Sequence, residues 1–186
     1  RQYGVVSPPL VTNGIVVVNS IINDGPRTKE MPPGHVRGFN PHTGAIEWMF
    51  ETIPQPGNFG NNTWENGSWE YTGNTNSWSI MSADDELGIV YLPIGTPTND
   101  WYGGLRHGDN LFVESLVALR GQTGERLWHF LMVHHGVVEY GLPAAPTLVE
   151  IVVDGKPIKA VAQISKQRCT YVFDRVTGEP VWPIIE

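Results

Sequence analysis

Two ionisable side chains in the second half of the chain are the residues best suited to chemistry. Glu139 can accept a proton, and Lys166, 27 residues later, can place positive charge beside an oxygen atom that becomes negative. Each has an ordinary alternative, because charged side chains are mostly exposed and a lone lysine in a loop is usually only solvated. Their chemistry therefore depends on which elements bring them together.

Two adjacent histidines, His134 and His135, precede this glutamate and could be taken for a metal-binding pair. Successive residues of an extended strand point to opposite faces, so two neighbours cannot easily share one metal ion. A joint site is therefore not expected. We expect one histidine to order a site and the other to pack.

A long aromatic loop supplies a third candidate. Residues 51–78 are rich in Asn, Gly, Trp and Tyr and carry no periodic apolar pattern. Loops of this length in a compact domain are usually functional or disordered. The rings of Trp64, Trp69, Trp78 and, beyond the next strand, Trp101 favour an ordered binding loop. For Trp64 and Trp69 the alternative, that the rings only cap a sheet, is equally open.

The elements that must position these side chains contain one sequence motif that occurs three times in the chain. Each copy is an apolar strand end, a polar turn closed by Thr-Gly, and a Trp four residues after that Gly. The glycine supplies the positive φ of a tight hairpin, and the tryptophan falls where a large ring can pack against a neighbouring unit. The copies contain Thr43-Gly44 with Trp48, Thr123-Gly124 with Trp128, and Thr177-Gly178 with Trp182.

The spacing of these copies predicts the fold class. The Thr-Gly pairs lie 80 and 54 residues apart, about the length of one four-stranded sheet, with a long insertion in the first interval. Self-similarity at this period is typical of a propeller or another stacked array. Short β-rich runs bounded by turn residues, with no convincing helix, predict an all-β fold. The clearest runs are residues 15–18, 88–92, 112–119, 147–153, 160–164 and 170–173.

Composition and charge limit the functions open to the chain. A net charge of −7 and a pI near 5.3 provide no basic stripe to neutralise phosphates, so no nucleic-acid partner is expected. No apolar run is long enough to span a bilayer, and the single Cys169 cannot form a disulfide within the chain. The chain opens at Arg1 without an initiator Met, and propeller blades bury their faces only against neighbours. We therefore expect a portion of a longer protein.

A series of short motifs runs nearly end to end through the chain. They are Ser7-Pro8-Pro9-Leu10-Val11, Val36-Arg37-Gly38-Phe39, Asn76-Ser77-Trp78, Val90-Tyr91-Leu92-Pro93, Arg106-His107-Gly108-Asp109-Asn110, His134-His135, Leu142-Pro143-Ala144-Ala145-Pro146 and Tyr171-Val172-Phe173-Asp174-Arg175. Each is weak alone, but together and in this order they are specific. In them the chain resembles the pyrroloquinoline quinone (PQQ) dehydrogenases, the quinoprotein alcohol and glucose dehydrogenases with an eight-bladed propeller. The sequences of these motifs most resemble those of the membrane-type glucose dehydrogenases and their soluble relatives.

The resemblance implies an activity and its partners. Members oxidise an alcohol or sugar hydroxyl: a general base takes the hydroxyl proton, hydride passes to the quinone, and the electrons leave to ubiquinone or a cytochrome. Residues 1–186 would then be about three to four blades of four-stranded antiparallel sheet from a single PQQ-type propeller domain, completed by the remaining blades of the full-length chain. We expect the fragment alone to be inactive. The implied location is the periplasm, soluble or attached to the inner membrane through a segment outside this chain.

The resemblance also implies a cofactor site. Trp78 matches the ring that forms the floor under the planar quinone, and Lys166 matches the cation at the quinone carbonyl. His135 is the third residue expected to contact the cofactor. The alternative for Trp78 is packing within a blade, but its place after Asn76 and Ser77 and before a strand favours the cofactor role.

The resemblance makes Glu139 the general base. Relatives carry a Trp-Asp pair shortly after the histidines; here Val138 and Glu139 take those places, and Gly141 replaces a second acid common in the glucose branch. The interval from Glu139 to Lys166 is the one that the glucose branch keeps between base and lysine. The extra methylene of Glu moves the carboxylate by about one bond length, and a misplacement of ~1 Å can cost ~100-fold in rate.

Calcium is the second implied cofactor, with Glu139 as its ligand. In the methanol branch the metal takes a Glu, an Asn and the base carboxylate, the oxygen ligands that calcium prefers. The matching places here are Pro33 and Thr96, neither a strong ligand. Either Glu139, the cofactor's own carboxylate and backbone oxygens hold the ion, or the ion is absent.

Two functions stay open on the sequence. One is a part of a PQQ-dependent alcohol or glucose-type dehydrogenase. The other is a non-catalytic propeller scaffold, such as an outer-membrane assembly lipoprotein, or a catalytically decayed relative. Blade repeats fit both functions. Trp78, Lys166 and an acid at position 139 belong only to the enzyme, whereas the altered segment 136–141 keeps the second function open.

Overall fold

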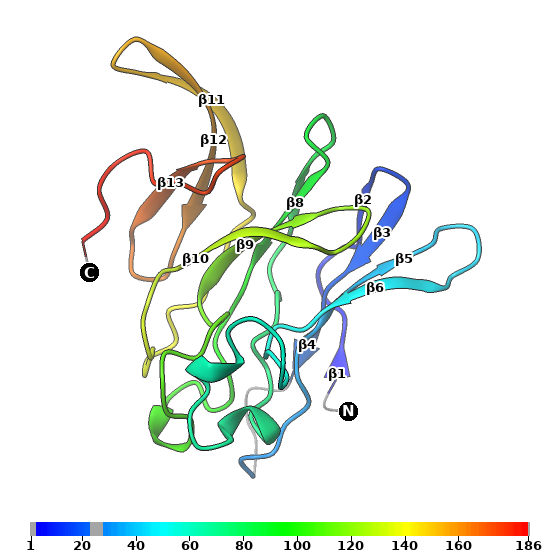
Figure 1. Ribbon diagram of the computed structural model, residues 1–186, viewed down its shortest axis with the longest axis vertical. Coiled ribbons are helices and arrows are strands. Elements are labelled where there is room, and N and C mark those ends of the chain that lie inside the picture. The colour runs from blue at the N-terminus through cyan, green and yellow to red at the C-terminus, as the bar shows by residue number, and fades with distance from the viewer. Residues whose placement is uncertain (1–2, 23–27, 186) are drawn as a thin grey trace.

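The computed structural model describes residues 3–22 and 28–185 and consists mainly of antiparallel strands and their connections (Figure 1). Two sheets have four strands each, in the orders β2-β3-β5-β6 and β7-β8-β9-β10; a third sheet has the order β11-β12-β13, and β1 pairs with β4. The strands are β1 (Tyr3–Gly4), β2 (Leu10–Thr12), β3 (Ile15–Val18), β4 (Ile21–Ile22), β5 (Val36–Phe39), β6 (Ile46–Phe50), β7 (Ser82–Asp84), β8 (Ile89–Pro93), β9 (Ser115–Arg120), β10 (Arg126–Leu131), β11 (Thr147–Val153), β12 (Lys156–Ile164) and β13 (Thr170–Asp174).

The three larger sheets stand side by side as successive blades. The second sheet lies between the other two in Figure 1, and its first strand, β7, contacts both β2 and β11. One apolar core joins the first and second blades, through residues such as Val36 and Leu92, and another joins the second and third, through Tyr91 and Phe173. The all-β, partial-propeller architecture is therefore confirmed.

Strand positions follow the sequence pattern with one informative difference. Residues 15–18 and 147–153 form β3 and β11 as predicted. The strand predicted for 112–119 begins only at Ser115. Glu114 has a φ of +48°, in the left-handed region, which no extended strand can accommodate. The apolar residues before it belong to a turn, so their hydrophobicity reflects burial rather than strand structure.

Helical structure in the described residues is limited to three single turns of 3-10 helix. None of the described helices is long and apolar enough to cross a membrane. Two of these turns lie in the long loop between β6 and β7, which is therefore ordered. The turns are η1 (Asn61–Thr63), η2 (Ser68–Glu70) and η3 (Gly103–Leu105).

The repeated tryptophans join one blade to the next. The indole N–H of Trp48, on β6, donates to the carbonyl of Gly121 in the second blade (3.0 Å), and Trp128, on β10, donates to Arg175 beyond β13 (3.2 Å). The ring of Trp48 also lies against the second Thr-Gly turn, where a Cβ at Gly124 would fall 2.6 Å from a ring atom. Trp128 repeats this contact at the third turn. The predicted equivalence of these two rings is therefore confirmed.

The third tryptophan of the repeat lies in a different environment. Trp182 follows an isolated bridge between Phe173 and Pro180, where a fourth strand of the third sheet would run. The turn before it has the same hydrogen bond as the other two, from the N–H of Gly178 to the carbonyl of Asp174 (2.9 Å). Its ring is 52% exposed, because none of the described residues forms a blade beyond the third.

The docking of Trp48 predicts an unusual sensitivity at Gly124. We expect Gly124→Ala to lower the free energy of unfolding of the full-length protein by about 2–4 kcal/mol, since the methyl group would combine backbone strain at φ +71° with overpacking. The control is Gly155→Ala, which has a similar φ of +75° but no heavy atom within 4 Å. It should cost about 1 kcal/mol. Equal shifts in the urea midpoint of both variants would contradict this assignment of Trp48.

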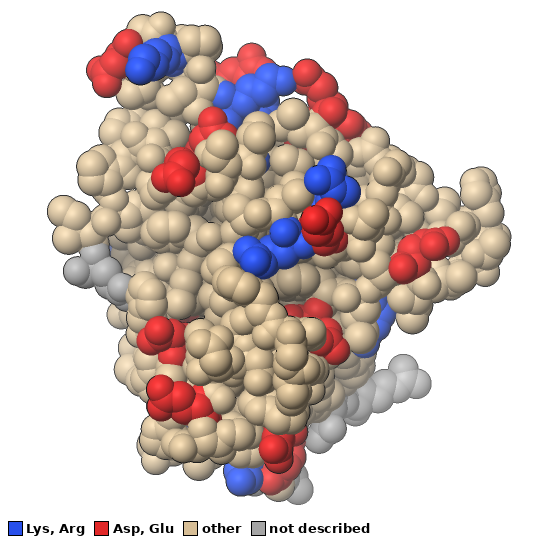
Figure 2. All heavy atoms as spheres, viewed as in Figure 1, with Lys and Arg blue, Asp and Glu red and all other residues tan. Residues whose placement is uncertain are grey.

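Charged side chains are scattered over the surface. On the face shown in Figure 2, acidic residues are spread over the whole surface and the basic residues form no continuous stripe. Pairs such as Lys159 with Glu86 (2.8 Å) are exposed and contribute little to stability. The pair of Arg175 with Asp84 (3.2 Å) differs, because both side chains are buried and it ties the third blade to β7.

Candidate functional site

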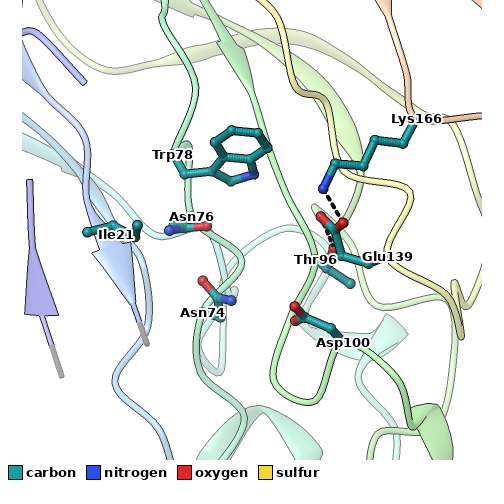
Figure 3. Close-up of a pocket in the computed structure, with 8 residues that line it drawn as sticks. All are labelled: Ile21, Asn74, Asn76, Trp78, Thr96, Asp100, Glu139 and Lys166. Atoms are coloured by element: carbon teal, nitrogen blue, oxygen red, sulfur yellow. Dashed lines mark hydrogen bonds and ion pairs between the residues drawn. The ribbon is translucent and has the colours of Figure 1, made fainter. Parts of the chain in front are cut away.

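One cavity of about 230 Å³ collects the sequence-predicted chemistry (Figure 3). Its walls come from the connections that follow the second and fourth strands of each blade. In an antiparallel meander these connections all lie at one end of the sheets, while the Thr-Gly turns lie at the other. The long loops at the lower end of Figure 1 therefore build the site. The lining residues are Ile21, Asn74, Asn76, Trp78, Thr96, Asp100, Glu139 and Lys166.

An ion pair and an aromatic ring form the centre of this cavity. The Lys166 ammonium contacts the Glu139 carboxylate and lies 5.1 Å from the centre of the Trp78 ring. Figure 3 shows the three side chains pointing toward a common space. The Glu139 side chain is 19% exposed and that of Lys166 33%, so both are reachable from solvent but partly withdrawn from it. A proton acceptor, a cation and a flat aromatic surface thus face one another.

The Trp78 ring is held by close backbone packing. A Cβ at Gly95 would lie 3.0 Å from two indole atoms, so only a residue without a side chain lets this loop lie against the ring. The Gly95 N–H donates to the carbonyl of Asn76 (2.8 Å), which joins the loop after β8 to the segment that carries Trp78. The next residue, Thr96, places its hydroxyl 3.5 Å from the Glu139 carboxylate. The platform and the acid are therefore connected by one short segment.

Two buried ionisable residues lie behind the Glu139 loop. Arg106 and Glu114 are both fully buried, and neither lines the cavity. Burial raises the pKa of Glu114 to about 7, an effect that the Tyr140 N–H and the Arg106 charge partly oppose. Burial also lowers the pKa of Arg106 to about 10, which leaves the guanidinium charged at neutral pH. Both side chains hydrogen-bond to the loop that carries Glu139.

The raised pKa of Glu114 predicts a pH-dependent stability. Between its ordinary value of 4.5 and about 7, the folded protein keeps a proton on Glu114 that the unfolded chain releases. The contribution of this group to the free energy of unfolding therefore falls as pH rises through that window. Glu114→Gln cannot ionise, so its stability relative to the wild type should increase from pH 4 to pH 8. Melting temperatures of both apoproteins across this range test it; a constant difference would contradict the raised pKa.

The structure brings together three of the four site residues predicted from the sequence. Trp78, Glu139 and Lys166 line one cavity. His135 does not line it; its ring Nδ1 lies 2.8 Å from the carbonyl of Gly108. Contact of His135 with the cofactor stays a prediction, as do the cofactor contact of Trp78 and the catalytic roles of Glu139 and Lys166.

The two tryptophans with open alternatives lie away from this cavity. Trp64 is buried in a small cluster with Ile53 and Val113 and donates its indole N–H to the carbonyl of Leu111. Trp69 packs on the edge of the same cluster. Trp64 is therefore a packing residue within the loop region, whereas Trp69 also lines a separate cavity beside Pro33 and His35.

Sequence reasoning missed several residues at or near the site. Asp100 lines the cavity from the loop after β8, and Asn74 lines it from the segment before Trp78. Arg106 was part of a family motif but received no role. Glu114 could have been noticed in the sequence, because it is a charged residue inside the apolar run 112–119. Charged residues are rarely buried without a partner, so its presence there indicates either that the strand prediction is wrong or that the residue has a buried role.

The residues present suit PQQ. The close approach of Gly95 fixes the Trp78 ring as a platform for a planar group, and Lys166 offers a cation to an anionic or carbonyl oxygen. A cation is a less complete fit. Oxygen donors of Glu139, Asp100 and Thr96 line the same cavity, as calcium prefers. Among the described residues, however, no three acidic, histidine or cysteine side chains are grouped to hold a metal. An ion would need further oxygens from backbone or cofactor.

Comparison with known proteins agrees with this site. All of residues 1–186 match the family described as "PQQ: Glucose/ethanol/alcohol dehydrogenase, beta-propeller domain". The chain is 36% identical, over 97% of its length, to the glycerol dehydrogenase large subunit of Gluconobacter oxydans (strain 621H). It is 34% identical, over 99%, to the quinoprotein glucose dehydrogenase of Escherichia coli (strain K12). These matches take in 24% and 23% of those proteins, so the chain spans about a quarter of the length of the curated relatives it matches.

A solved structure extends the comparison to three dimensions. The quinohemoprotein alcohol dehydrogenase ADHIIG of Pseudomonas putida HK5 superposes with a TM-score of 0.84 at 31% identity. The superposition covers 98% of this chain and 28% of that one. The family match over residues 1–186 agrees with the blades and with the site at one end of them. This chain belongs to the β-propeller family of PQQ-dependent glucose, ethanol and alcohol dehydrogenases.

Proposed function

We propose that the full-length protein is a PQQ-dependent dehydrogenase that oxidises an alcohol or sugar hydroxyl, and that this chain contributes part of its active site. The convergence of Trp78, Glu139 and Lys166 on one cavity supports this proposal most directly. The three residues lie on connections far apart in the sequence. A chain selected only for blade packing has no reason to place an acid, a cation and a half-buried indole ring at one cavity.

Each of these side chains has a defined task in the proposed reaction. Glu139 takes the proton of the substrate hydroxyl as general base, since its carboxylate is partly exposed to the cavity. Lys166 supplies a fixed positive charge beside the Trp78 face, and Trp78 orients a planar group by stacking. PQQ, when bound, supplies the hydride-accepting chemistry.

Calcium is the second cofactor that we propose. Its ligands in this chain would be Glu139 and Asp100, with Thr96 nearby, and the remaining oxygens would come from backbone and cofactor. Pro33, one of the two expected ligand positions, forms a backbone bridge with Asn74 and offers no side-chain donor.

The remaining parts of the proposal concern the whole protein. We place residues 1–186 within a single propeller domain, with the remaining blades supplied by the rest of the chain. The electron acceptor is ubiquinone or a cytochrome. The location is the periplasm, either in solution or attached to the inner membrane through a segment outside this chain. The substrate class rests on relatives that are glycerol, glucose and alcohol dehydrogenases.

The rival function is a non-catalytic scaffold or a decayed enzyme. It accounts for the blade repeats and for the replacements at Val138 and Gly141. It does not account for the ion pair of Glu139 with Lys166 beside the Trp78 ring. An acid is therefore retained where the proposed mechanism needs one.

Reconstitution of the full-length apoprotein tests the proposal. We expect added PQQ and calcium to bind and to support dye reduction by at least one compound from a panel of alcohols and sugars. Trp78→Ala should weaken PQQ binding, whereas Trp69→Ala, in the same loop but outside the cavity, should not. A well-folded full-length protein that binds no PQQ would overturn the proposal in favour of the scaffold.

A further inference from the structure

We propose that Glu114 and Arg106 are positioning residues for Glu139: they hold the loop 136–140 at its two ends and so fix the direction of the catalytic carboxylate. The predicted effect on turnover rests on the proposed function, whereas the predicted effect on the conformation of the loop does not. Both side chains are fully buried, and both come from the connection between β8 and β9. They act from behind the cavity rather than from its lining.

The two hydrogen bonds lie on either side of Glu139. The Arg106 guanidinium donates to the carbonyl of Gly136, at the start of the loop. Oε1 of Glu114 accepts the N–H of Tyr140 (2.8 Å). That N–H belongs to the peptide unit joining Glu139 to Tyr140, so Glu114 fixes the peptide plane attached to the Cα of Glu139. A carboxyl oxygen accepts this hydrogen bond in either protonation state of Glu114.

Arg106 is itself held in place. Its guanidinium donates to the side-chain oxygen of Asn110 (2.8 Å), and the amide of Asn110 donates to the carbonyl of His107 (3.0 Å). Its charge also lies close enough to Glu114 to favour the ionised carboxylate. The two side chains thus form one buried cluster, and each makes a hydrogen bond to the same loop.

Glu114 also connects this loop to the aromatic platform. Its backbone N–H donates to the carbonyl of Gly95 (3.2 Å), and Gly95 lies against the Trp78 ring. The following hydroxyl, of Thr96, reaches the Glu139 carboxylate. One residue therefore holds the platform through its backbone and the base loop through its side chain, so a shift at Glu114 would alter the spacing between them.

The loop is shaped to accept this carboxylate. A Cβ at Gly136 would lie 2.1 Å from Oε2 of Glu114, so the carboxylate fills the space that a side chain at 136 would need. The φ of Gly136 lies outside the positive region, so space rather than backbone conformation requires glycine there. A buried carboxylate is costly unless it is paired and hydrogen-bonded. Glu114 Oε2 has no hydrogen-bond partner among the described residues, a cost that blade packing alone does not explain.

The test uses the full-length protein and three substitutions. Glu114→Ala removes the acceptor, Glu114→Gln keeps an oxygen for the Tyr140 N–H, and Glu125→Ala is a matched control at an exposed carboxylate. Hydrogen–deuterium exchange of the peptide 133–142 reports the loop without any need for activity. We expect Glu114→Ala to speed exchange there at least tenfold, Glu114→Gln to restore most of the protection, and the control to change nothing.

Steady-state kinetics with PQQ supplied then separate positioning from folding. Glu114→Ala should lower kcat by about 100-fold, the cost of a misplacement of ~1 Å, with a much smaller change in KM and in PQQ affinity. Glu114→Gln should recover most of kcat. If Glu114→Ala does not fold, Gly136→Ala displaces the same loop and should show the same pattern of exchange and kcat.

These measurements distinguish a failure of the positioning role from a failure of the proposed function. Unchanged exchange at 133–142 in a folded Glu114→Ala or Gly136→Ala variant overturns the positioning role, whatever the activity. Faster exchange with an unchanged kcat also overturns it, because the loop then moves without consequence. A wild-type protein without PQQ-dependent turnover would refute the proposed function, while the exchange measurement would still decide whether Glu114 holds the loop.

Discussion

Replacing Glu139 by Gln should lower the turnover of the full-length enzyme by about 100- to 10,000-fold, the contribution typical of a general base. The amide keeps the size and shape of the side chain but cannot accept the substrate proton. PQQ affinity should change much less, since Trp78 and Lys166 remain in place. Turnover with dye and PQQ titration by absorbance measure the two quantities separately.

A second substitution at the same position distinguishes loss of the base from general damage. Glu139→Asp keeps a carboxylate on a side chain one methylene shorter, the residue expected here from the family resemblance. It should therefore retain far more turnover than Glu139→Gln. If Glu139→Gln left the turnover of an active enzyme unchanged, the general base would be another residue. The alignment of residues 134–141 with the family would then be wrong.

Removing Lys166 should have the second largest effect. We expect Lys166→Ala to lower kcat by about 100-fold with PQQ and calcium supplied, because a fixed positive donor beside the Trp78 face is lost. The substitution also leaves the Glu139 carboxylate without its ion-pair partner. The measurement is steady-state turnover together with PQQ affinity.

The chain offers a matched control for this lysine. Lys159, on the same hairpin, also pairs with a glutamate, Glu86, but the pair is exposed and far from the cavity. Lys159→Ala should leave kcat near that of the wild type. Equal losses in Lys166→Ala and Lys159→Ala would show that the effect comes from charge or stability in general, and would remove Lys166 from the site.

Local features of the sequence determined the blades. A Thr-Gly turn needs only a positive φ at one residue, and its glycine is visible in the sequence. The tryptophan four residues later marks the same place of each unit, and the structure confirms this for Trp48 and Trp128. The antiparallel order also follows from sequence, because short turns can only join neighbouring strands in opposite directions.

Resemblance to a family identified part of the site without any geometry. Trp78, Glu139 and Lys166 were singled out by motif and spacing, and the structure places all three at one cavity. His135 does not line this cavity, and its contact with the cofactor stays a prediction. A motif records that a residue recurs, whereas the direction of a side chain depends on a loop conformation, here a φ of +50° at His135 itself.

Only the tertiary structure revealed the buried residues that contact the Glu139 loop from outside the cavity. The acid of Glu114 sits in an apolar run that predicted a strand, and the long-range bond that it makes, to Tyr140, spans 26 residues. Asp100 reaches the cavity from the loop after β8, and no sequence motif marked it for this site. Turn formation depends on the conformational preferences of neighbouring residues, so the sequence alone can determine it. The pairing of Arg106 and Glu114 with the Glu139 loop depends on burial and on contacts between distant segments, and these exist only once the blades have packed.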